Sequence, residues 1–186
     1  WNFRLTPRWF TKYGVRKMNF RPWGFNLYKT RDTGELESFF NESRPFGFFL
    51  KSGEFFEYNL IQQYDRPDES FELTDEITIP AGKYWMYRQE FQFGTFQGRR
   101  VWAYAAYSWG GYYTGKINTV ETALGININK HLNLSTEYTY NHIRLPEGIA
   151  HTHELAQFIN YAFTTKLNIA YFVQWNSVAD YLAGNF

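Results

Sequence analysis

Cysteine is missing from this sequence of 186 residues. Its absence excludes disulfide bonds and thiolate metal sites. An excess of one charge sign is missing too, because 19 Lys and Arg residues nearly balance 18 Asp and Glu residues and leave a net charge of +1. A nucleic-acid-binding protein would carry a clear basic excess. We therefore predict no nucleic-acid partner.

Long hydrophobic runs are also lacking. No stretch reaches the roughly 20 apolar residues that a transmembrane helix needs, and no segment repeats with the 3.6-residue period of an amphipathic helix. The sequence opens on Trp1, with neither a start methionine nor a signal-peptide pattern. We expect the chain to be a mature or partial segment of a larger protein.

Aromatic residues are abundant instead. The chain has 19 Phe, 15 Tyr and 7 Trp residues, which together make up 22% of it. Aromatic residues favour β-strands, and they form belts at the two interfaces of membrane β-barrels. The mean hydropathy of -0.51 is compatible with such a barrel, because only alternate residues of each strand face lipid.

Apolar and polar residues alternate in four successive runs between residues 117 and 175. In the run from Leu132 to His142, Leu134 and Tyr138 fall on one parity and Glu137 on the other. Side chains of a strand point alternately to opposite faces. Each run therefore predicts a strand with one apolar, aromatic face and one polar face, which is the pattern of a transmembrane β-barrel.

About ten strands are expected along the chain, most of them long enough to cross a bilayer at a tilt. Their expected ranges are 1–11, 17–30, 37–51, 54–64, 84–95, 100–109, 117–128, 132–142, 152–163 and 167–176. Pro7 predicts an interruption in the first, and the first 70 residues are the least regular.

Connection lengths predict an orientation. Short connections are expected around Gly53, Gln97-Gly98, Asn129-Lys130 and Thr165-Lys166. Longer connections are expected at Asp65 to Lys83, Gly110 to Lys116 and Leu145 to His151. Alternating short and long connections are typical of the periplasmic turns and extracellular loops of bacterial outer-membrane barrels.

These patterns predict an all-β protein, namely an antiparallel transmembrane β-barrel of a bacterial outer membrane. We expect one domain over residues 1–186, which forms part of a barrel. The alternative is a soluble antiparallel sandwich or lipocalin-like barrel that binds a ligand, because such folds also alternate. Strand length and the polar residues in mid-strand favour the membrane barrel.

Six short sequence motifs occur in a characteristic order between residues 77 and 177. They are ITIPAGKY (Ile77 to Tyr84), GGYYTGK (Gly110 to Lys116), LSTEY (Leu134 to Tyr138), IRLPEG (Ile143 to Gly148), NYAF (Asn160 to Phe163) and VQWNS (Val173 to Ser177). Over about Phe71 to Tyr181 the chain resembles the C-terminal barrel of the domain-of-unknown-function 5916 family.

Members of that family are large outer-membrane proteins of Bacteroidota-type bacteria, usually with an N-terminal family 9-like carbohydrate-binding domain that this sequence lacks. The resemblance implies an outer-membrane barrel that continues beyond the VQWNS segment. Some members carry a membrane-associated hydrolase label, but the resemblance supplies no catalytic motif to match here.

The polar parity of the strands predicts residues that face the lumen of the barrel. These are Arg88, Glu90, Glu121, Asn133, Glu137, Asn141, Asn168, Gln174 and Asn176. In a wide barrel such residues line water and set solute preference, whereas in a narrow one they pair across the lumen.

Three histidines on the outward parity are candidate metal ligands. His151 and His153 share one strand face, and we expect His142 on the adjoining strand to lie nearly opposite His153. Imidazoles at that spacing could share a metal ion. The competing interpretation is a cluster of polar side chains at the membrane rim, so no cofactor is predicted.

Catalytic and glycan-binding alternatives use other residues. A hydrolase would need a serine beside a histidine, but Ser108, Ser135 and Ser177 do not share the histidine parity. Glu121 and Glu137 could form a carboxylate pair, although polar lumen residues explain them equally.

Trp109, Tyr112 and Tyr113 are candidates for stacking on sugar rings, or for the aromatic belt. We expect a channel or scaffold for uptake or export of glycan-derived material, with outer-membrane lipid, glycan and other outer-membrane or periplasmic proteins as partners. The alternative is a surface-exposed membrane-associated hydrolase or glycan-binding barrel.

Overall fold

Strands make up the fold throughout. The computed structural model describes residues 2–5, 8–10, 14–29, 33–74, 77–164, 166–178 and 180–185. The strands are β1 (Asn2–Leu5), β2 (Arg8–Phe10), β3 (Val15–Asn19), β4 (Trp23–Lys29), β5 (Leu36–Leu50), β6 (Phe55–Asp65), β7 (Phe71–Thr74), β8 (Ile77–Ile79), β9 (Tyr84–Gly94), β10 (Val101–Tyr112), β11 (Gly115–Asn127), β12 (Leu132–Leu145), β13 (Gly148–Ala162), β14 (Asn168–Asn176) and β15 (Tyr181–Asn185). Over these residues there is no helix able to cross a membrane.

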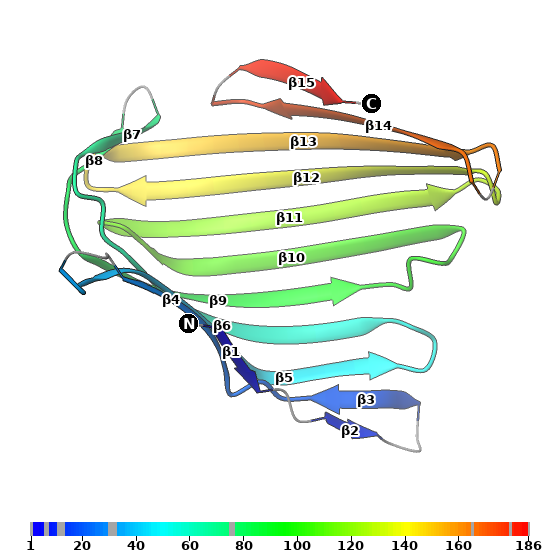
Figure 1. Cartoon of the computed structure of the whole chain (residues 1–186), viewed down its shortest axis with the longest axis horizontal. Helices are drawn as coiled ribbons and strands as arrows, with labels where there is room; N and C mark the ends of the chain where they lie inside the picture. Colours follow the sequence, from blue (N-terminus) through cyan, green and yellow to red (C-terminus); the bar gives the residue numbers. More distant parts are fainter. Residues whose placement is uncertain are drawn as a thin grey trace.

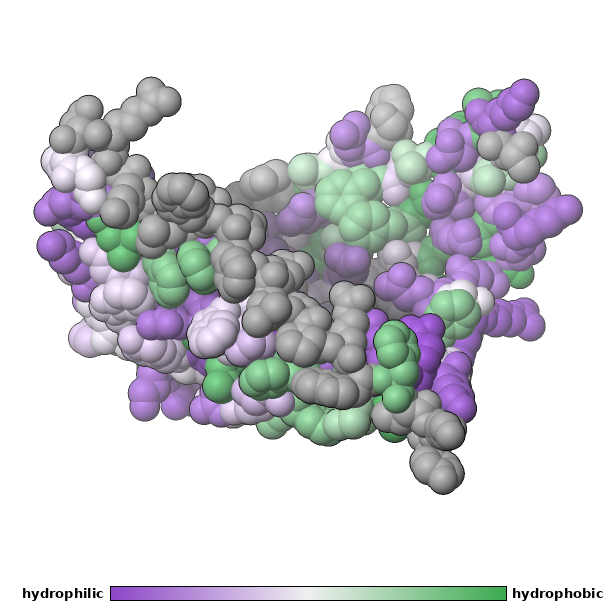
Figure 2. All heavy atoms as spheres, turned by 60° about the horizontal axis from the view of Figure 1, so that its bottom comes forward, coloured by the Kyte–Doolittle hydropathy of each residue, from purple (hydrophilic) through white to green (hydrophobic). Residues whose placement is uncertain are grey.

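Thirteen of the strands form one antiparallel sheet in the order β1-β4-β5-β6-β9-β10-β11-β12-β13-β14-β15, with β3 also paired to β5 and β2 to β3. The sheet curls into an open trough with β15 at one edge (Figures 1 and 2). Among the described residues no pairing joins β1 to β15, so the sheet does not close. The predicted all-β, antiparallel architecture is confirmed at this level.

The two faces of the sheet are defined by the cross-strand register. One row of paired residues runs through Asn59, Glu90, Ser108, Thr119, Asn141 and Thr152. We call the face that carries this row the inner face, because its side chains are buried or half-buried on the concave side of the trough. The opposite face is the outer face.

Charge is divided unequally between these faces. In the described strands β6 and β9–β14 every Asp and Glu lies on the inner face, namely Glu57, Asp65, Glu90, Glu121, Glu137 and Glu154. The outer face of the same strands has only two Lys or Arg residues, Lys116 and Arg144, which are paired at one end of the sheet. Its large apolar side chains are exposed, as the 60% exposed Tyr87 and the 62% exposed Leu124 illustrate.

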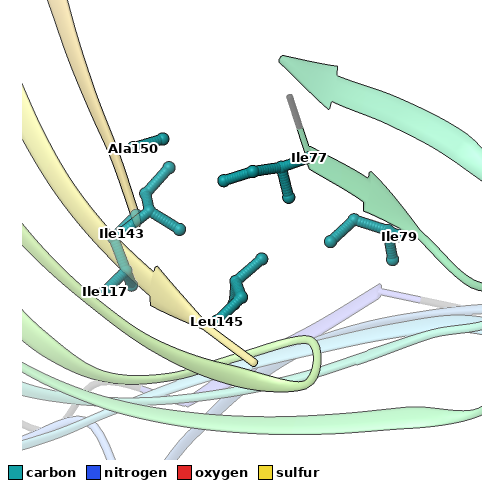
Figure 3. Packing of buried hydrophobic residues seen from close by; sticks show 6 residues of the cluster. All are labelled: Ile77, Ile79, Ile117, Ile143, Leu145 and Ala150. Atoms are coloured by element: carbon teal, nitrogen blue, oxygen red, sulfur yellow. The ribbon is translucent and has the colours of Figure 1, made fainter. Parts of the chain in front are cut away.

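The small hairpin of β7 and β8 forms a second sheet of two strands. It lies over one end of the inner face, beside β12 and β13 (Figure 1). Ile77 and Ile79, which are fully buried, pack there against apolar residues from three strands of the main sheet (Figure 3). Those residues are Ile117 on β11, Ile143 and Leu145 on β12, and Ala150 on β13.

This hairpin occupies part of the connection that we expected to be a surface loop, from Asp65 to Lys83. The prediction of a long connection is right, but its ITI segment is a buried strand rather than an exposed loop. The cause is the apolar pocket at the end of the inner face, which an isoleucine pair fills.

Two other predicted loops are wrong. Gly110 to Lys116 and Leu145 to His151 are each reduced to a turn of two residues, and the flanking strands extend into both segments. Gly110 lies within β10, and this position requires glycine. A Cβ there would lie 2.2 Å from the Tyr87 carbonyl oxygen, and the φ of 149° suits glycine. The predicted alternation of short and long connections is therefore wrong, and the connection lengths do not indicate which end of the sheet would face outward.

The first third of the chain is more fragmented than predicted. The expected strand 17–30 is split into β3 and β4, which both pair with β5, and an isolated bridge between Arg21 and Arg44 lies between them. Pro22 removes a ladder donor at the break. The predicted interruption at Pro7 and the turn residue Thr165 fall outside the described residues.

Candidate functional site: the inner face of the sheet

A buried ionic cluster centred on Arg44 dominates the inner face of β5 and β6. Its guanidinium donates to Glu57 Oε1 at 2.6 Å, to Asn59 Oδ1 at 2.8 Å and to Glu42 Oε1 at 3.1 Å. Glu42 also accepts from Arg21 Nη1 at 2.7 Å. A buried charge is tolerated when it is paired and hydrogen-bonded, and each nitrogen of Arg44 has a partner here.

A bulge in β5 lies directly beside Arg44. The register between β5 and β6 shifts between Ser43 and Phe46, so residues after the bulge exchange faces relative to a simple alternation. Gly47 leaves room for the Asn19 side chain, because a Cβ there would lie 2.3 Å from Asn19 Oδ1. The bulge and Gly47 thus flank the polar contacts of Arg44 on the inner face.

The cluster continues across the sheet through Glu90 on β9. Its Oε1 accepts from Asn59 Nδ2 at 2.9 Å and from Gln92 Nε2 at 2.6 Å. Arg88 on the same strand donates from Nη2 to Gln63 Oε1 at 3.0 Å. Amide side chains therefore link the carboxylates of neighbouring strands.

Farther along the sheet, hydroxyl and amide side chains form ladders on the inner face, beside the carboxylates Glu121, Glu137 and Glu154. Thr119 donates to Asn141 Oδ1 at 2.7 Å, and Asn141 Nδ2 donates to Thr152 Oγ1 at 2.9 Å. In the next row, Asn176 Nδ2 donates to Glu154 Oε1 at 3.1 Å. These ladders satisfy the polar groups of β11 to β14 without a second layer of protein above them.

All nine predicted lumen residues lie on the inner face by register. The sequence prediction missed Arg44, Glu57 and Asn59. Glu57 and Asn59 alternate with Phe56 and Tyr58, a signal that could have been used. Arg44 shares the parity of Glu42 on the inner face, whereas the bulge reverses the parity of the residues that follow, which alternation does not reveal.

The three histidines lie on the outer face, but not in the expected pairing. His142 is opposite His151, and Tyr140 is opposite His153, because Pro146 and Glu147 alone form the turn. The His142 and His151 rings stack with their centroids 4.6 Å apart. The partners of His151 Nδ1 and His153 Nδ1 are tyrosine hydroxyls, at 2.7 and 2.8 Å.

Metal binding gains no support from this geometry. Among the described residues no group of three or more His, Cys, Asp or Glu side chains could hold a metal ion. The interleaved histidines and tyrosines form instead a polar aromatic ladder next to the Arg144 row, in which Arg144 Nε donates to His142 Nε2 at 3.1 Å.

The predicted sugar-stacking residues are not brought together. Trp109 packs on the outer face with Phe91 and Tyr107, at centroid distances of 5.5 and 5.3 Å. Tyr112 and Tyr113 instead pack against the β7–β8 hairpin.

At that end of the sheet the Tyr113 hydroxyl donates to Asp65 Oδ2 at 2.8 Å. Burial, together with this hydrogen bond, raises the pKa of Tyr113 above its usual range. Tyr113 therefore stays protonated and acts as a donor that ties the β10–β11 turn to the end of β6.

None of Ser108, Ser135 and Ser177 shows a side-chain hydrogen bond to a histidine ring of the described residues. Ser177 Oγ accepts from the His153 backbone N–H at 2.8 Å, and Ser108 lies on the inner face between Glu90 and Thr119. Glu121 and Glu137 lie on adjacent strands one row apart. By register Glu121 is opposite Ala106 and Thr139, and Glu137 is opposite Ala123 and Ala156.

Comparisons of the chain with protein-family models, curated proteins and solved structures found no match. The resemblance to the domain-of-unknown-function 5916 barrel thus stays a prediction.

Proposed function

We propose that this chain forms part of the wall of a transmembrane β-barrel in a bacterial outer membrane. In this proposal the outer face contacts lipid, the inner face lines an aqueous interior, and the barrel acts as a channel or scaffold in uptake or export. The family resemblance is consistent with this location.

The observation that carries the proposal is the division of charge between the two faces. Apart from Lys116 and Arg144 at one end, the outer face of the described strands β6 and β9–β14 has no formal charge, while its Trp, Tyr, Leu and Ile side chains are exposed. A soluble protein rarely leaves so continuous an apolar surface uncovered. Lipid would cover it, and the curled sheet would keep Glu and Arg side chains in water.

The test is extraction of the natural protein from membranes, followed by electrophoresis with and without boiling. A barrel wall requires detergent for extraction, and its folded band migrates differently from the boiled band. Release into plain buffer as a monodisperse species, with no change on boiling, would contradict the proposal and favour a soluble β-protein.

A further inference from the structure

The inner face contains a hollow of about 610 Å³ near the β13–β14 end of the sheet. Its lining includes Trp102, Ser135, Glu137, Phe158, Asn160 and Phe172. The register explains how it forms. One cross-strand row reads Trp102, Gly125, Ser135, Phe158, Phe172 and Asn185 from β10 to β15. The Trp102 side chain covers Gly125, and the small Ser135 next to it leaves space before the large Phe158.

The walls of the hollow are aromatic rings. The Trp102 indole lies directly over Gly125, where a Cβ would be 2.0 Å from the ring. On the other side, the Phe158 and Phe172 rings are in contact, with centroids 4.8 Å apart. All three side chains are half-buried, so ring surface remains open to the hollow.

On the inner face of the strands around the hollow the charge has one sign, and Arg99 of the β9–β10 turn is paired with Glu54. Glu137 lines it, is exposed, and forms no ion pair with any described residue. Over the described strands β10 to β15, the inner face has no Lys, Arg or His, whereas it also carries Glu121 and Glu154. A neutral ligand would gain nothing from this negative field, but a cation would.

We propose that this hollow is a binding site for an organic cation, with a substituted ammonium group held between the aromatic rings and the Glu137 carboxylate. Aromatic faces attract ammonium groups through the ring quadrupole, most strongly for Trp. The volume is in the range of small-molecule sites. This inference names the solute class of the inner face described under the proposed function, and it requires only that this face be open to water.

The experiment compares choline with 3,3-dimethylbutan-1-ol, which has the same shape but a carbon in place of the ammonium nitrogen. Binding to the full chain is measured by calorimetry, in detergent or in buffer, whichever keeps the protein monodisperse. Choline is expected to bind about ten-fold more tightly than the neutral alcohol. Its affinity is expected to fall as NaCl is added, because salt screens the Glu137 charge.

Glu137→Gln keeps the side-chain shape and is expected to abolish the preference for choline. Glu154→Gln is the matched control, because Glu154 is an inner-face carboxylate that accepts from Asn176 and does not line the hollow. Trp102→Ala is expected to weaken both ligands. If Trp102→Ala fails to fold, the effect of Glu137→Gln on the preference for choline still tests the cation site.

Three outcomes would overturn the cation site: equal binding of choline and the alcohol, binding of maltose that Glu137→Gln leaves unchanged, or no binding of any of these probes. The second outcome would indicate a saccharide site. Because the titration does not depend on the medium, a protein that proves soluble would contradict the proposed function without deciding this site.

Discussion

At the scale of single residues, the Arg44 cluster is the most constrained part of the inner face. Arg44 and Glu57 are both only 8% exposed as side chains. Removing one partner of such a pair would leave an uncompensated charge. The β5 bulge lies next to this cluster, because the register between β5 and β6 shifts between Ser43 and Phe46.

A second ionic contact, in the β5–β6 turn, predicts a pH effect. Glu54 accepts hydrogen bonds from Ser52 and from Arg99 of the β9–β10 turn. These contacts lower the pKa of Glu54 from its ordinary value of 4.5, and the hydrogen bond from Ser52 has the largest effect. A carboxyl group whose pKa is lower in the folded than in the unfolded protein stabilises the folded state at pH values above the unfolded pKa. This stabilisation is lost as the pH falls through the folded pKa.

We therefore expect the wild-type protein to be more stable than Glu54→Gln at neutral pH, and the difference to shrink as the pH is lowered below 4.5. Urea titrations of both proteins at several pH values measure this. Glu69→Gln, at an exposed position in the β6–β7 connection, is the control. A difference that stays constant down to low pH would contradict the role of the Glu54 carboxylate.

At the scale of elements, the β7–β8 hairpin should behave as a separate unit. It makes no ladder with the main sheet, so its attachment depends on side chains such as Ile79, which is 0% exposed. Truncation of a buried isoleucine costs about 2–5 kcal/mol. We expect Ile79→Ala to release the hairpin while the long strands stay folded.

Hydrogen exchange resolved by segment would measure that release. Ile79→Ala should lose amide protection in β7 and β8, with little change in β11 to β13. Thr78→Ala is the matched control, because Thr78 points to solvent between the two buried isoleucines. Equal loss of protection throughout the sheet would mean that the hairpin is part of one cooperative unit.

The alternation of apolar and polar residues in the sequence is sufficient to predict the regular strands and which residues share a face. The expected ranges 37–51, 54–64 and 84–95 agree with β5, β6 and β9 to within a residue or so at each end. The agreement has a simple physical basis, because a period of two is visible wherever one face is apolar and the other polar.

The errors arose where glycine and proline were interpreted as loop signals. Gly110 and Gly115 lie inside strands, where they allow the neighbouring backbone to approach closely. The histidine pairing was wrong for a related reason, since it required the exact centre of a turn. The ionic cluster of Arg44 depends on contacts between strands that one strand's pattern does not contain.

At the scale of the whole molecule, the outer face should respond to charge according to depth if it contacts lipid. Leu124 and Ile149 are both 62% exposed on this face. Leu124 lies eight residues along β11 from the charged row of Lys116 and Arg144, whereas Ile149 is paired with Arg144 in that row. A barrel in lipid is expected to lose about 2–4 kcal/mol for an arginine at mid-depth but only about 0–1 near an interface.

We expect Leu124→Arg to destabilise the protein in lipid vesicles by several-fold more than Ile149→Arg, measured as the free energy of unfolding in urea. The two variants control for each other, because exposure and substitution are matched. If both cost less than about 0.5 kcal/mol, as exposed substitutions in water usually do, the outer face is not in contact with lipid.

The hairpin also has a geometric role. The chain enters it from β6 and leaves it into β9, yet Ile77 and Ile79 rest on β11, β12 and β13. It therefore spans the arc of the trough as a chord, and ties together strands that are not neighbours in the sheet. Because the hairpin joins the β6 and β9 side of the trough to β11, β12 and β13, we expect it to limit how far the sheet can flatten at that end.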